Sequence, residues 1–575
     1  MQSTMPSGWS AVGRAGQIKK AAGEEYDVVI IGGGITGAGI ARECALRGIS
    51  FCLVEKRDFA FGTSSRSSKL FHGGIRYLSS HEFGLVREST TERNWLLHHL
   101  PNLVRPLGFM YCAYEKGKDR PIMVKVGVKL YEIFSDWCSD FKNFRKSRIF
   151  KKDFVEEFEP ALETESPELG KLLLAGFYYD TNCDDARVTL EIIKESLEYA
   201  AGNSVALSYA RVEGYRLDSS GRARGVVVRD ELDGGSFEVR GRVVVSATGI
   251  WTDELLGKAG YGRTTIYPTK GVHIIVPNER IGNRNAFGLR SFDDGRFFFV
   301  LRREKVTVIG TTDTAYYPES RNLDEPWCKK EDCDYLLRTV NRMFPHARLT
   351  YDDVIGTFAG IRPLIKQEGA KHESDVSRTH EIMATDNGVV AIAGGKSTTH
   401  RRMAEELLFY LVDEGYLPGF KRPEHSRRGY SKVPFKVGIS RREFDAALTA
   451  GGLHEVSWPE QTDYLYRQFG RQGVGILERI RKDPESGQPL LEGYPHCRAE
   501  IEFILEYENA PKLIDVLCRR TEAQWMIWHY KQPRLAAEVA AIMASFYGWS
   551  AERREAEIGE YLTYVENTVR FIREN

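Results

Sequence analysis

A glycine pattern near the start of the chain constrains the fold more than any other feature. Residues 26–31 (YDVVII) form a short β-branched apolar run, which predicts a buried strand, and Gly32-x-Gly34-x-x-Gly37 follows it directly. A helical pattern then continues to Gly48, and a second apolar run comes after it. Strand, glycine turn, helix and strand within about 30 residues make a βαβ unit.

The pattern suits the binding of a dinucleotide. Gly32 permits the tight turn, Gly34 lets backbone N–H groups approach a pyrophosphate, and Gly37 allows the helix to pack closely on the strand. Glu55 ends the second strand, where an acid accepts hydrogen bonds from ribose hydroxyls and disfavours a 2′-phosphate. No second pattern of this kind with a trailing acid occurs, so a bound NAD in addition is not expected.

Later segments indicate how the rest of the chain is organised. The runs 241–249 and 388–395 predict two more buried strands, each ending in glycine. Alternating segments between them suit an antiparallel sheet, and helical patterns dominate from residue 440 onward. We therefore expect an α/β fold with a Rossmann-type nucleotide domain, interleaved with an antiparallel-sheet substrate domain and followed by a helical domain. The expected limits are a leader at 1–24, a nucleotide domain at 25–100, 180–265 and 355–415, a substrate domain at 101–179 and 266–354, and a helical cap at 420–575.

Bulk composition excludes several classes of protein. Lys+Arg 80 balances Asp+Glu 80, which argues against a dedicated nucleic-acid binder. The nine cysteines are scattered without a C-x-x-C pair, so neither a disulfide framework nor a zinc site is indicated. No apolar run of about 18 residues occurs, so no membrane-spanning helix is expected. A calcium-loop pattern is also missing from the sequence, and no metal is predicted.

Two charged segments suggest where the protein resides. The first 23 residues contain no acid and include Arg14, Lys19 and Lys20, which fits a mitochondrial presequence, although an unstructured leader explains them equally well. Residues 141–154 (FKNFRKSRIFKKDF) carry six cations with phenylalanine and isoleucine between them. Such a segment suits an anionic membrane surface, and a solvated basic face is the simpler explanation.

Several motifs together resemble one family. The segments VVIIGGGITGAGIARECALRG, LVEKRDFAFGTSSRSSKLFHGGIRYL, ATGIWTDEL, KGVHIIVP, VIGTTDT, FAGIRPL and AGGKSTTHRRMAE occur in the order found in FAD-dependent glycerol-3-phosphate dehydrogenases. The resemblance covers residues 25 to 410 strongly and the tail, with DVLCRRT, more loosely. It implies a fold shared with the D-amino-acid-oxidase-like flavoproteins, with FAD as the cofactor. The cofactor-binding residues that we expect are Gly32, Gly34, Gly37, Glu55, Thr63, Ser64, Ser67, Ser68, Lys69, Gly73, Gly249, Gly394, Gly395 and Lys396.

The resemblance also implies substrate and catalytic residues. A phosphate monoester requires cations, and Arg76, Arg362, Arg378 and Lys396 match the substrate-contacting positions of the family. His72 and Thr398 complete the expected substrate-binding set. The catalytic residues that we expect are His273, Arg362 and Lys396. His273 is one candidate for the proton acceptor, and His72 is the other unless it positions the flavin.

The implied reaction oxidises glycerol 3-phosphate to dihydroxyacetone phosphate and passes electrons through FAD to ubiquinone. The alternatives are an oxidase that uses oxygen and releases peroxide, an amine or amino-acid oxidase on the same fold, and an RNA-associated flavoprotein without turnover. The expected location is the surface of the mitochondrial inner membrane, or of the plasma membrane in a bacterium. A homodimer is compatible with the resemblance.

Overall fold

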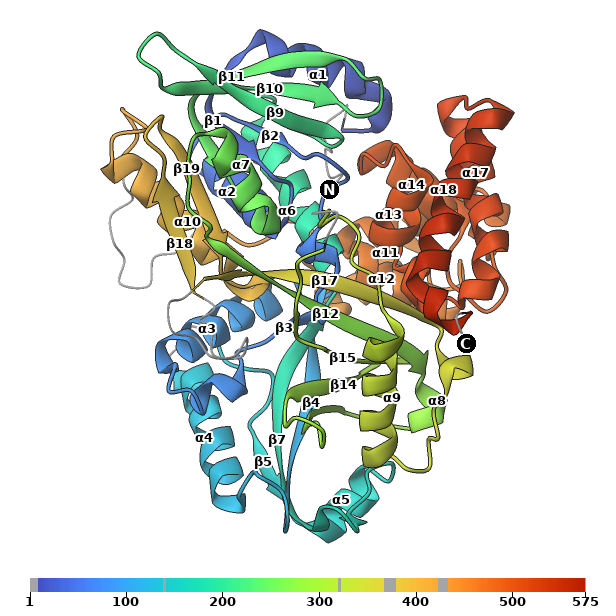
Figure 1. Ribbon diagram of the computed structural model, residues 1–575. Helices are drawn as coiled ribbons and strands as arrows, with labels where there is room; N and C mark the ends of the chain where they lie inside the picture. Colours follow the sequence, from blue (N-terminus) through green and yellow to red (C-terminus); the bar gives the residue numbers. More distant parts are fainter. Residues whose placement is uncertain (1–8, 138–140, 319–321, 367–378, 422–432, 574–575) are drawn as a thin grey trace.

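The computed structural model contains two β-sheets, drawn one above the other, and a group of C-terminal helices at their side (Figure 1). The sheets come from interleaved parts of the sequence, as the positions of their strands show. The candidate site lies among elements of both sheets. The residues that the structure describes are 9–137, 141–318, 322–366, 379–421 and 433–573.

The first sheet has a parallel core around the strand that precedes the glycine turn. Its order is β18-β19-β11-β1-β2-β8, with β10 pairing β11 and β9 pairing β10. Side chains of β1 point alternately to two cores: Val28 and Ile30 pack with α2, α6 and α10, whereas Val29 and Ile31 pack toward α1, α7, β9 and β10. Burial on both faces explains why the strand is continuously apolar. The strands are β1 Glu25–Ile31, β2 Phe51–Val54, β8 Val205–Leu207, β9 Ala210–Leu217, β10 Ala223–Asp230, β11 Ser236–Ser246, β18 His380–Ala384 and β19 Val389–Gly394. The helices are α1 Arg14–Gly23, α2 Ile35–Leu46, α6 Asp185–Ala200, α7 Thr252–Lys258 and α10 His400–Asp413.

The second sheet is mostly antiparallel, as the alternating segments predicted. Its main path is β16-β12-β15-β14-β13-β4-β7-β3, with β17 on β12 and with β5 and β6 on β7. The strands are β3 Leu70–Phe71, β4 Val104–Tyr114, β5 Arg148–Phe150, β6 Glu165–Ser166, β7 Gly170–Cys183, β12 Ile266–Pro277, β13 Ala286–Arg290, β14 Phe297–Arg303, β15 Val306–Gly310, β16 Thr314–Ala315 and β17 Gly356–Ile365. The helices beside this sheet are α3 Phe83–His99, α4 Pro121–Trp137, α5 Lys152–Phe158, α8 Asn278–Ile281 and α9 Lys330–Met343.

The expected boundary at residue 355 is wrong for one strand. It assigned β17 to the nucleotide domain, whereas β17 pairs with β12 over its whole length, from Gly356 opposite Ile275 to Ile365 opposite Ile266. An apolar run alone does not reveal which sheet a strand joins, because the partner is chosen by tertiary packing. The other domain limits remain predictions.

The segment expected as a leader is folded from residue 9 onward. Trp9 is buried and stacks on Phe59 with ring centroids 5.7 Å apart. Arg14, at the start of α1, is buried against Asp230 at 2.8 Å. Residues 9–23 are therefore part of the nucleotide domain in this structure, which corrects the expectation of an unstructured leader.

The C-terminal part is helical, as predicted, and has a hydrophobic core of its own. No helix in the described ranges is both long enough and apolar enough to cross a bilayer. The helices are α11 Arg441–Gly451, α12 Pro459–Phe469, α13 Arg471–Lys482, α14 Arg498–Tyr507, α15 Leu513–Asp515, α16 Ala523–Met526, α17 Gln532–Tyr547 and α18 Ala551–Val569.

Candidate active site

A long cavity opens at the carboxyl ends of the parallel strands β1, β2, β11 and β19, the usual ligand position in such sheets. It encloses about 1270 Å³ of empty space, counting its mouth. The sequence analysis expected many of its wall residues. Those that line it are Gly32, Gly34, Glu55, Thr63, Ser64, Ser67, Gly249, Gly394, Gly395 and Lys396.

The glycine turn lies in the wall of this cavity, and two of its three glycines, Gly32 and Gly37, leave no room for a side chain. Gly32 has φ +107°, and a Cβ on it would lie 2.6 Å from the Ala247 carbonyl oxygen. A Cβ on Gly37 would lie 1.9 Å from the Gly32 carbonyl oxygen. The turn therefore opens the start of α2 to a ligand, and the partial positive charge of a helix N-terminus favours a pyrophosphate there.

Glu55 stands at the end of β2, beside the turn. Its two carboxylate oxygens accept hydrogen bonds from Gly33 N at 2.8 Å and Arg57 N at 2.9 Å. Burial raises the pKa of this carboxyl, and the two backbone donors oppose that shift. An oriented carboxylate in the cavity wall fits the hydroxyls of a ribose. The residues present thus fit a dinucleotide.

Four of the expected cofactor residues do not line the cavity but support its walls. Lys69 forms a buried ion pair with Asp185 at 2.6 Å. Ser68 Oγ lies 2.9 Å from Nε2 of His273. Gly73 is pressed against neighbouring side chains, since a Cβ there would lie 2.3 Å from Thr90. The fourth is Gly37, packed beneath the turn.

Cations gather at the end of the cavity where Lys396 lies. The Lys396 ammonium sits 3.9 Å from the centroid of the Tyr77 ring and 3.2 Å from Ser89 Oγ. Arg76 lies over the same ring at 5.0 Å. Enclosure by the protein and the charge of Arg76 lower the pKa of Lys396 to about 7.

Arg362 is held in a defined orientation. Its guanidinium donates to Asp313 Oδ1 at 2.9 Å and to Thr311 Oγ1 at 3.0 Å. Burial lowers the pKa of Arg362, Asp313 opposes this, and Arg76 adds to it. The charge of Arg76 thus influences the pKa of both Arg362 and Lys396. Arg362 itself lines neither cavity, although the next residue, Pro363, lines the cofactor cavity.

His72 and Thr398 are brought together beside this cluster. His72 N donates to Thr398 Oγ1 at 3.3 Å, and Thr398 is buried. His72 lines a small aromatic-walled cavity together with Arg76, Phe297 and Phe299. Burial, and then Lys396 and Arg76, lower the pKa of His72 well below its ordinary value, so the ring is neutral.

His273 lines neither the cofactor cavity nor the small cavity beside His72. The side chain is 2% exposed, stacks on Phe358 at 4.7 Å, and has no partner for Nδ1 among the described residues. Burial, followed by Arg362 and Lys69, lowers the pKa of His273 to about 3. The environment therefore suits a neutral ring more than a strong base. Arg378, the remaining expected substrate residue, lies outside the described residues.

Other residues of the site were not expected from the sequence. Lys56 lies 4.0 Å from the ring centroid of Trp251 at the cavity wall, and Asp313 orients Arg362. Both Trp251 and Asp313 fall inside motifs quoted for the family resemblance, so position in a motif was the available signal.

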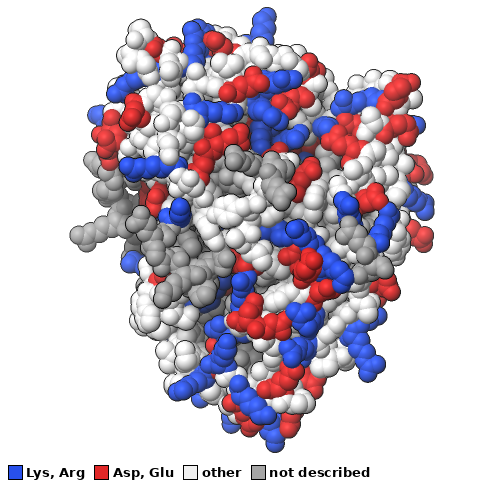
Figure 2. All heavy atoms as spheres, viewed as in Figure 1, with Lys and Arg blue, Asp and Glu red and all other residues white. Residues whose placement is uncertain are grey.

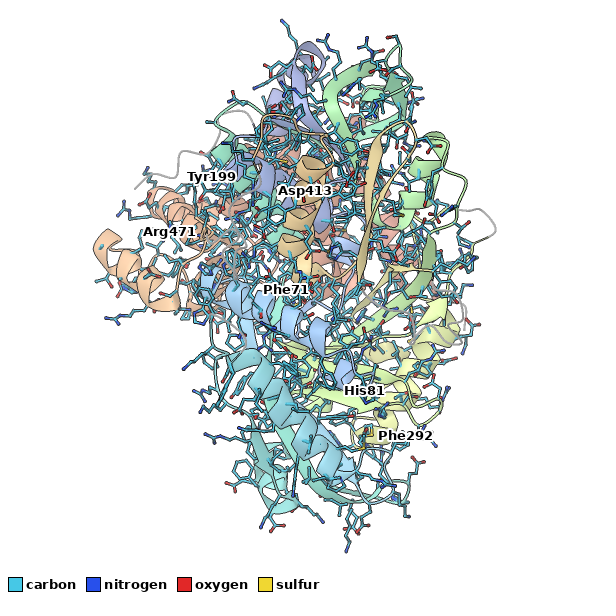
Figure 3. All side chains as sticks on the ribbon, turned by 90° about the vertical axis from the view of Figure 1, so that its left-hand side faces the viewer. Phe71, His81, Tyr199, Phe292, Asp413 and Arg471 are labelled. Carbon is cyan, nitrogen blue, oxygen red and sulfur yellow. The ribbon has the colours of Figure 1, made fainter. Side chains whose placement is uncertain are left out.

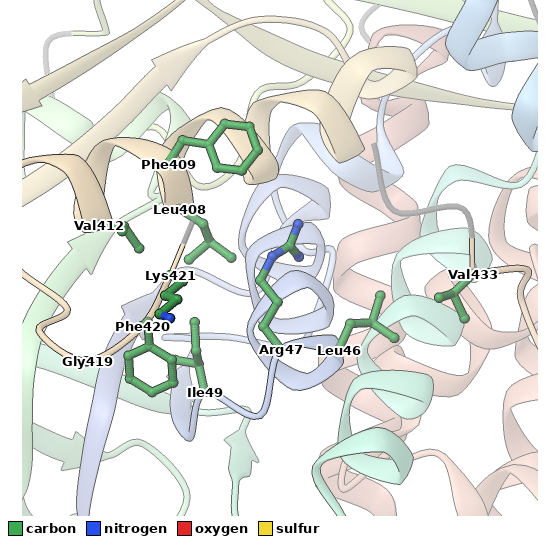
Figure 4. Close-up of a pocket in the computed structure, with 10 residues that line it drawn as sticks. All are labelled: Leu46, Arg47, Ile49, Leu408, Phe409, Val412, Gly419, Phe420, Lys421 and Val433. Atoms are coloured by element: carbon green, nitrogen blue, oxygen red, sulfur yellow. The ribbon is translucent and has the colours of Figure 1, made fainter. Parts of the chain in front are cut away.

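A second cavity lies between α2 and α10 (Figure 4). It is mostly apolar, and none of the expected site residues lines it. It is therefore not the candidate site. Its lining residues are Leu46, Arg47, Ile49, Leu408, Phe409, Val412, Gly419, Phe420, Lys421 and Val433.

Comparison with known proteins agrees with this geometry. Residues 27–400 match the family described as FAD dependent oxidoreductase, and residues 440–554 match the C-terminal domain of alpha-glycerophosphate oxidase. Glycerol-3-phosphate dehydrogenase 2 of Mycobacterium tuberculosis is 35% identical over 98% of this chain and 92% of its own length. The aerobic glycerol-3-phosphate dehydrogenase of Bacillus subtilis is 33% identical over 86% of this chain and 87% of its own.

Solved structures show the same fold. The glycerol-3-phosphate dehydrogenase of Bacillus halodurans complexed with FAD superposes with a TM-score of 0.77 at 29% identity, covering 98% of both chains. The L-alpha-glycerophosphate oxidase of Mycoplasma pneumoniae, with FAD bound, has a TM-score of 0.52 at 17% identity, over 68% of this chain and 95% of its own. The second likeness supports the fold alone.

Fold and cavity together define a flavoprotein oxidoreductase with the D-amino-acid-oxidase type of fold, and its cofactor is FAD. Within that class the chain belongs to the family of FAD-dependent glycerol-3-phosphate dehydrogenases. The resemblance, the fold class and the cofactor stated from the sequence are confirmed.

Proposed function

We propose that this protein oxidises sn-glycerol 3-phosphate to dihydroxyacetone phosphate. The observation that carries the proposal is the group of cations formed by Lys396, which lines the cofactor cavity, Arg76, which lines the small cavity beside His72, and Arg362, which directly precedes the lining residue Pro363. Several cations in one region suit a phosphate dianion, whereas a single carboxylate needs fewer. The names of the relatives, which are glycerol-3-phosphate dehydrogenases, support this choice of substrate.

The side chains take different parts in this proposal. Arg76 and Arg362 bind the phosphate and the C2 oxygen, and Asp313 fixes the direction of the Arg362 guanidinium. Lys396, with a pKa of about 7, accepts the proton of the C2 hydroxyl. FAD supplies the acceptor for the hydride that leaves C2. His273, the earlier candidate for the proton acceptor, is less suited because its pKa is about 3.

The remaining expected site residues have supporting parts. Thr398 holds the backbone of His72, which lines the small cavity together with Arg76. Arg378 belongs to the proposed substrate contacts from the resemblance alone. The cofactor-binding residues named from the sequence remain proposals as individual contacts, and ten of them line the cavity.

The experiment that tests the substrate is an anaerobic titration of the purified protein. We expect the oxidised flavin band to bleach with glycerol 3-phosphate and to persist with glycerol or amino acids. A flavin band that persists with glycerol 3-phosphate would refute the substrate assignment. Bleaching by amino acids instead would establish an amino-acid oxidase on the same fold.

We propose ubiquinone, within a membrane, as the electron acceptor. The outer face of α4 carries exposed Ile122, Val126, Ile133 and Trp137, the last with 85% of its surface exposed. Figure 3 looks onto this side, and α4 lies on the face toward the viewer. An apolar helical face of this kind, with lysines beside it, suits insertion into a lipid surface.

The basic segment 141–154 supports the same surface. Its exposed cations follow α4 in the chain, and Figure 2 shows Lys and Arg side chains among acidic ones at the lower end of the molecule. Cations beside an apolar helix face strengthen binding to anionic lipid. The exposed cations of the segment are Lys142, Arg145, Lys146, Arg148 and Lys151.

Oxygen is the second candidate acceptor, because the C-terminal part matches a domain described from alpha-glycerophosphate oxidase. Peroxide release, measured with and without a short-chain quinone, separates the two. A dehydrogenase transfers electrons to the quinone and releases little peroxide. Stoichiometric peroxide in air, unaffected by quinone, would establish the oxidase.

Location and assembly are also proposals. We place the protein peripherally on the plasma membrane, since the relatives named above are bacterial enzymes. These comparisons do not support the mitochondrial inner membrane, the other of the two expected locations. A homodimer remains a prediction, and light scattering on the purified protein tests it. No nucleic acid is proposed as a partner.

A further inference from the structure

The C-terminal motif DVLCRRT, residues 515–521, makes an unexpected long-range contact. Its π-helix, Val516–Arg520, presents two consecutive arginines to Asp58, which follows the second strand of the nucleotide domain. Arg520 forms a fork with both Asp58 carboxylate oxygens, at 2.6 and 2.9 Å. Arg519 Nε donates to the same carboxylate. We call this set of three residues the Asp58 clamp.

The clamp is sealed from solvent. The side chains of Asp58 and Arg520 are 0% exposed, and that of Arg519 is 5% exposed. Burial opposes ionisation of Asp58, yet the two guanidiniums lower its pKa overall. A buried carboxylate between two arginines is costly to leave unpaired, so each partner restrains the others. The forked geometry is one that lysine cannot reproduce.

Asp58 connects directly to the underside of the glycine turn. The next residue, Phe59, packs on Gly33, where a Cβ would lie 2.6 Å from Phe59 Cδ1. Ala60, with φ +61°, donates from its backbone N to the Gly33 carbonyl at 3.0 Å. The loop 58–60 is thus the surface on which the pyrophosphate-binding turn rests.

A second connection reaches the ribose side of the cavity. Arg519 donates to Asp515 Oδ1 at 2.6 Å, and the hydroxyl of Tyr209 donates to the same oxygen at 2.6 Å. The residue after Tyr209 is Ala210, which lines the cavity and donates to the Glu55 carbonyl at 2.7 Å. The loop 58–60, which follows Glu55, and the segment Tyr209–Ala210, which is hydrogen-bonded to Glu55, are therefore both linked to residues 515–520 of the C-terminal domain.

We propose that the C-terminal helical domain sets the affinity for FAD by holding the loop 58–60 beneath the glycine turn. Arg519 and Arg520 are positioning residues, because no residue beyond 397 is among those that line the cofactor cavity. The inference depends on the FAD site and not on the identity of the substrate. A failure of the substrate assignment would leave it untouched.

The test compares full-length variants of the clamp with a matched control. Arg520→Lys and Arg519→Lys keep the charge but lose the fork. The control is Arg303→Lys, since Arg303 also bridges to the C-terminal domain through Glu522 at 2.6 Å, with side chains 6% and 9% exposed, but does not belong to the clamp. Each apoprotein is titrated with FAD, and the release of flavin on heating is followed beside circular dichroism.

We expect the dissociation constant for FAD to rise at least about tenfold in the clamp variants, because a weakened buried ion pair restrains the loop 58–60 less. In the control the dissociation constant should rise by less than about threefold. Flavin should leave the clamp variants below the temperature of global unfolding. Hydrogen exchange of the backbone at 55–62 should speed up in Arg519→Lys, which serves if Arg520→Lys does not fold. Equal changes in clamp and control variants, or wild-type affinity in folded clamp variants, would overturn the proposal.

Discussion

At the scale of single residues, enclosure decides the chemistry of the site. Lys396 and His273 are both titratable, and both lose part of their affinity for a proton through burial and nearby cations. The size of the effect differs: the pKa of Lys396 falls to about 7, whereas that of His273 falls to about 3. Lys396 therefore titrates within the pH range in which an enzyme works, whereas His273 remains neutral throughout that range.

The first prediction concerns the dependence of activity on pH. Because Lys396 loses its proton near pH 7, we expect kcat/KM for glycerol 3-phosphate to rise through that pH and then level off. Lys396→Met should lose this rise and at least about tenfold in kcat/KM, the scale of a lost general base. Steady-state kinetics between pH 5.5 and about 9 check it. A kcat/KM that falls above pH 7 would instead assign Lys396 to the phosphate.

The same shift has a consequence for stability. The folded-state pKa of Lys396 lies below that of the unfolded chain, so the unfolded state binds more protons between the two values. Stability should therefore rise with pH from about 7 toward the ordinary lysine range, and Lys396→Met should reduce this slope. Thermal unfolding at several pH values provides the measurement.

The second prediction concerns His273. Since its pKa is about 3, His273→Gln should leave the shape of the pH profile unchanged above pH 6, although kcat/KM falls by about tenfold through the lost contact with Ser68. Ser68→Ala removes the same contact and serves as the control. Loss of a pH limb in His273→Gln alone would restore His273 as the proton acceptor.

At the scale of elements, the βαβ unit and helix α4 differ in how much of their role can be predicted from the sequence. The glycine turn is read directly from the sequence, because a positive φ and close backbone approaches require glycine. The role of α4 is not evident from the sequence. Its side chains Val124, Val128 and Tyr131 are buried, whereas equally apolar side chains on the opposite face are exposed to solvent. The sequence of an apolar helix does not show which of its faces remains exposed to solvent.

The third prediction tests the glycine turn. In Gly37→Ala the new methyl would lie 1.9 Å from the Gly32 carbonyl oxygen, so the turn must shift. We expect the dissociation constant for FAD to rise at least about tenfold, in line with the cost of overpacking. Gly475→Ala, in α13, meets no atom within 4 Å and should leave FAD binding unchanged. Tight FAD binding by Gly37→Ala would show that the turn tolerates a side chain.

The fourth prediction tests α4 as the lipid-binding element. The double variant Val126→Ser and Trp137→Ser removes exposed apolar surface without touching the buried face. We expect liposome binding to weaken by about tenfold or more, while activity with a soluble dye as acceptor stays unchanged. Neutralising the five exposed cations of 141–154 should weaken binding to anionic vesicles alone. Unchanged binding in both variants would remove the membrane proposal.

At the scale of the whole molecule, the two sheets are assembled from segments far apart in the sequence. Strand β1 pairs with β11, more than 200 residues later in the chain, and β11 pairs in turn with β19, whereas β17 belongs to the second sheet through its pairing with β12. The C-terminal helices then join this assembly through buried ion pairs, of which Asp58 with Arg519 and Arg520 is one. The cofactor cavity lies at the carboxyl ends of the parallel strands, and its lining residues come from segments between residues 31 and 397.

The sequence by itself determined the strand–turn–helix unit, the acid at the end of the second strand, the antiparallel character of the middle segments and the helical tail. These features depend on local conformation and on burial patterns with a short period. Tertiary structure alone decided that β17 joins the second sheet, that residues 9–23 fold onto the nucleotide domain, and that Lys396 titrates near 7 while His273 does not. The physical reason is that sheet partners, burial and neighbouring charges come from residues distant in the chain, and no local pattern encodes them.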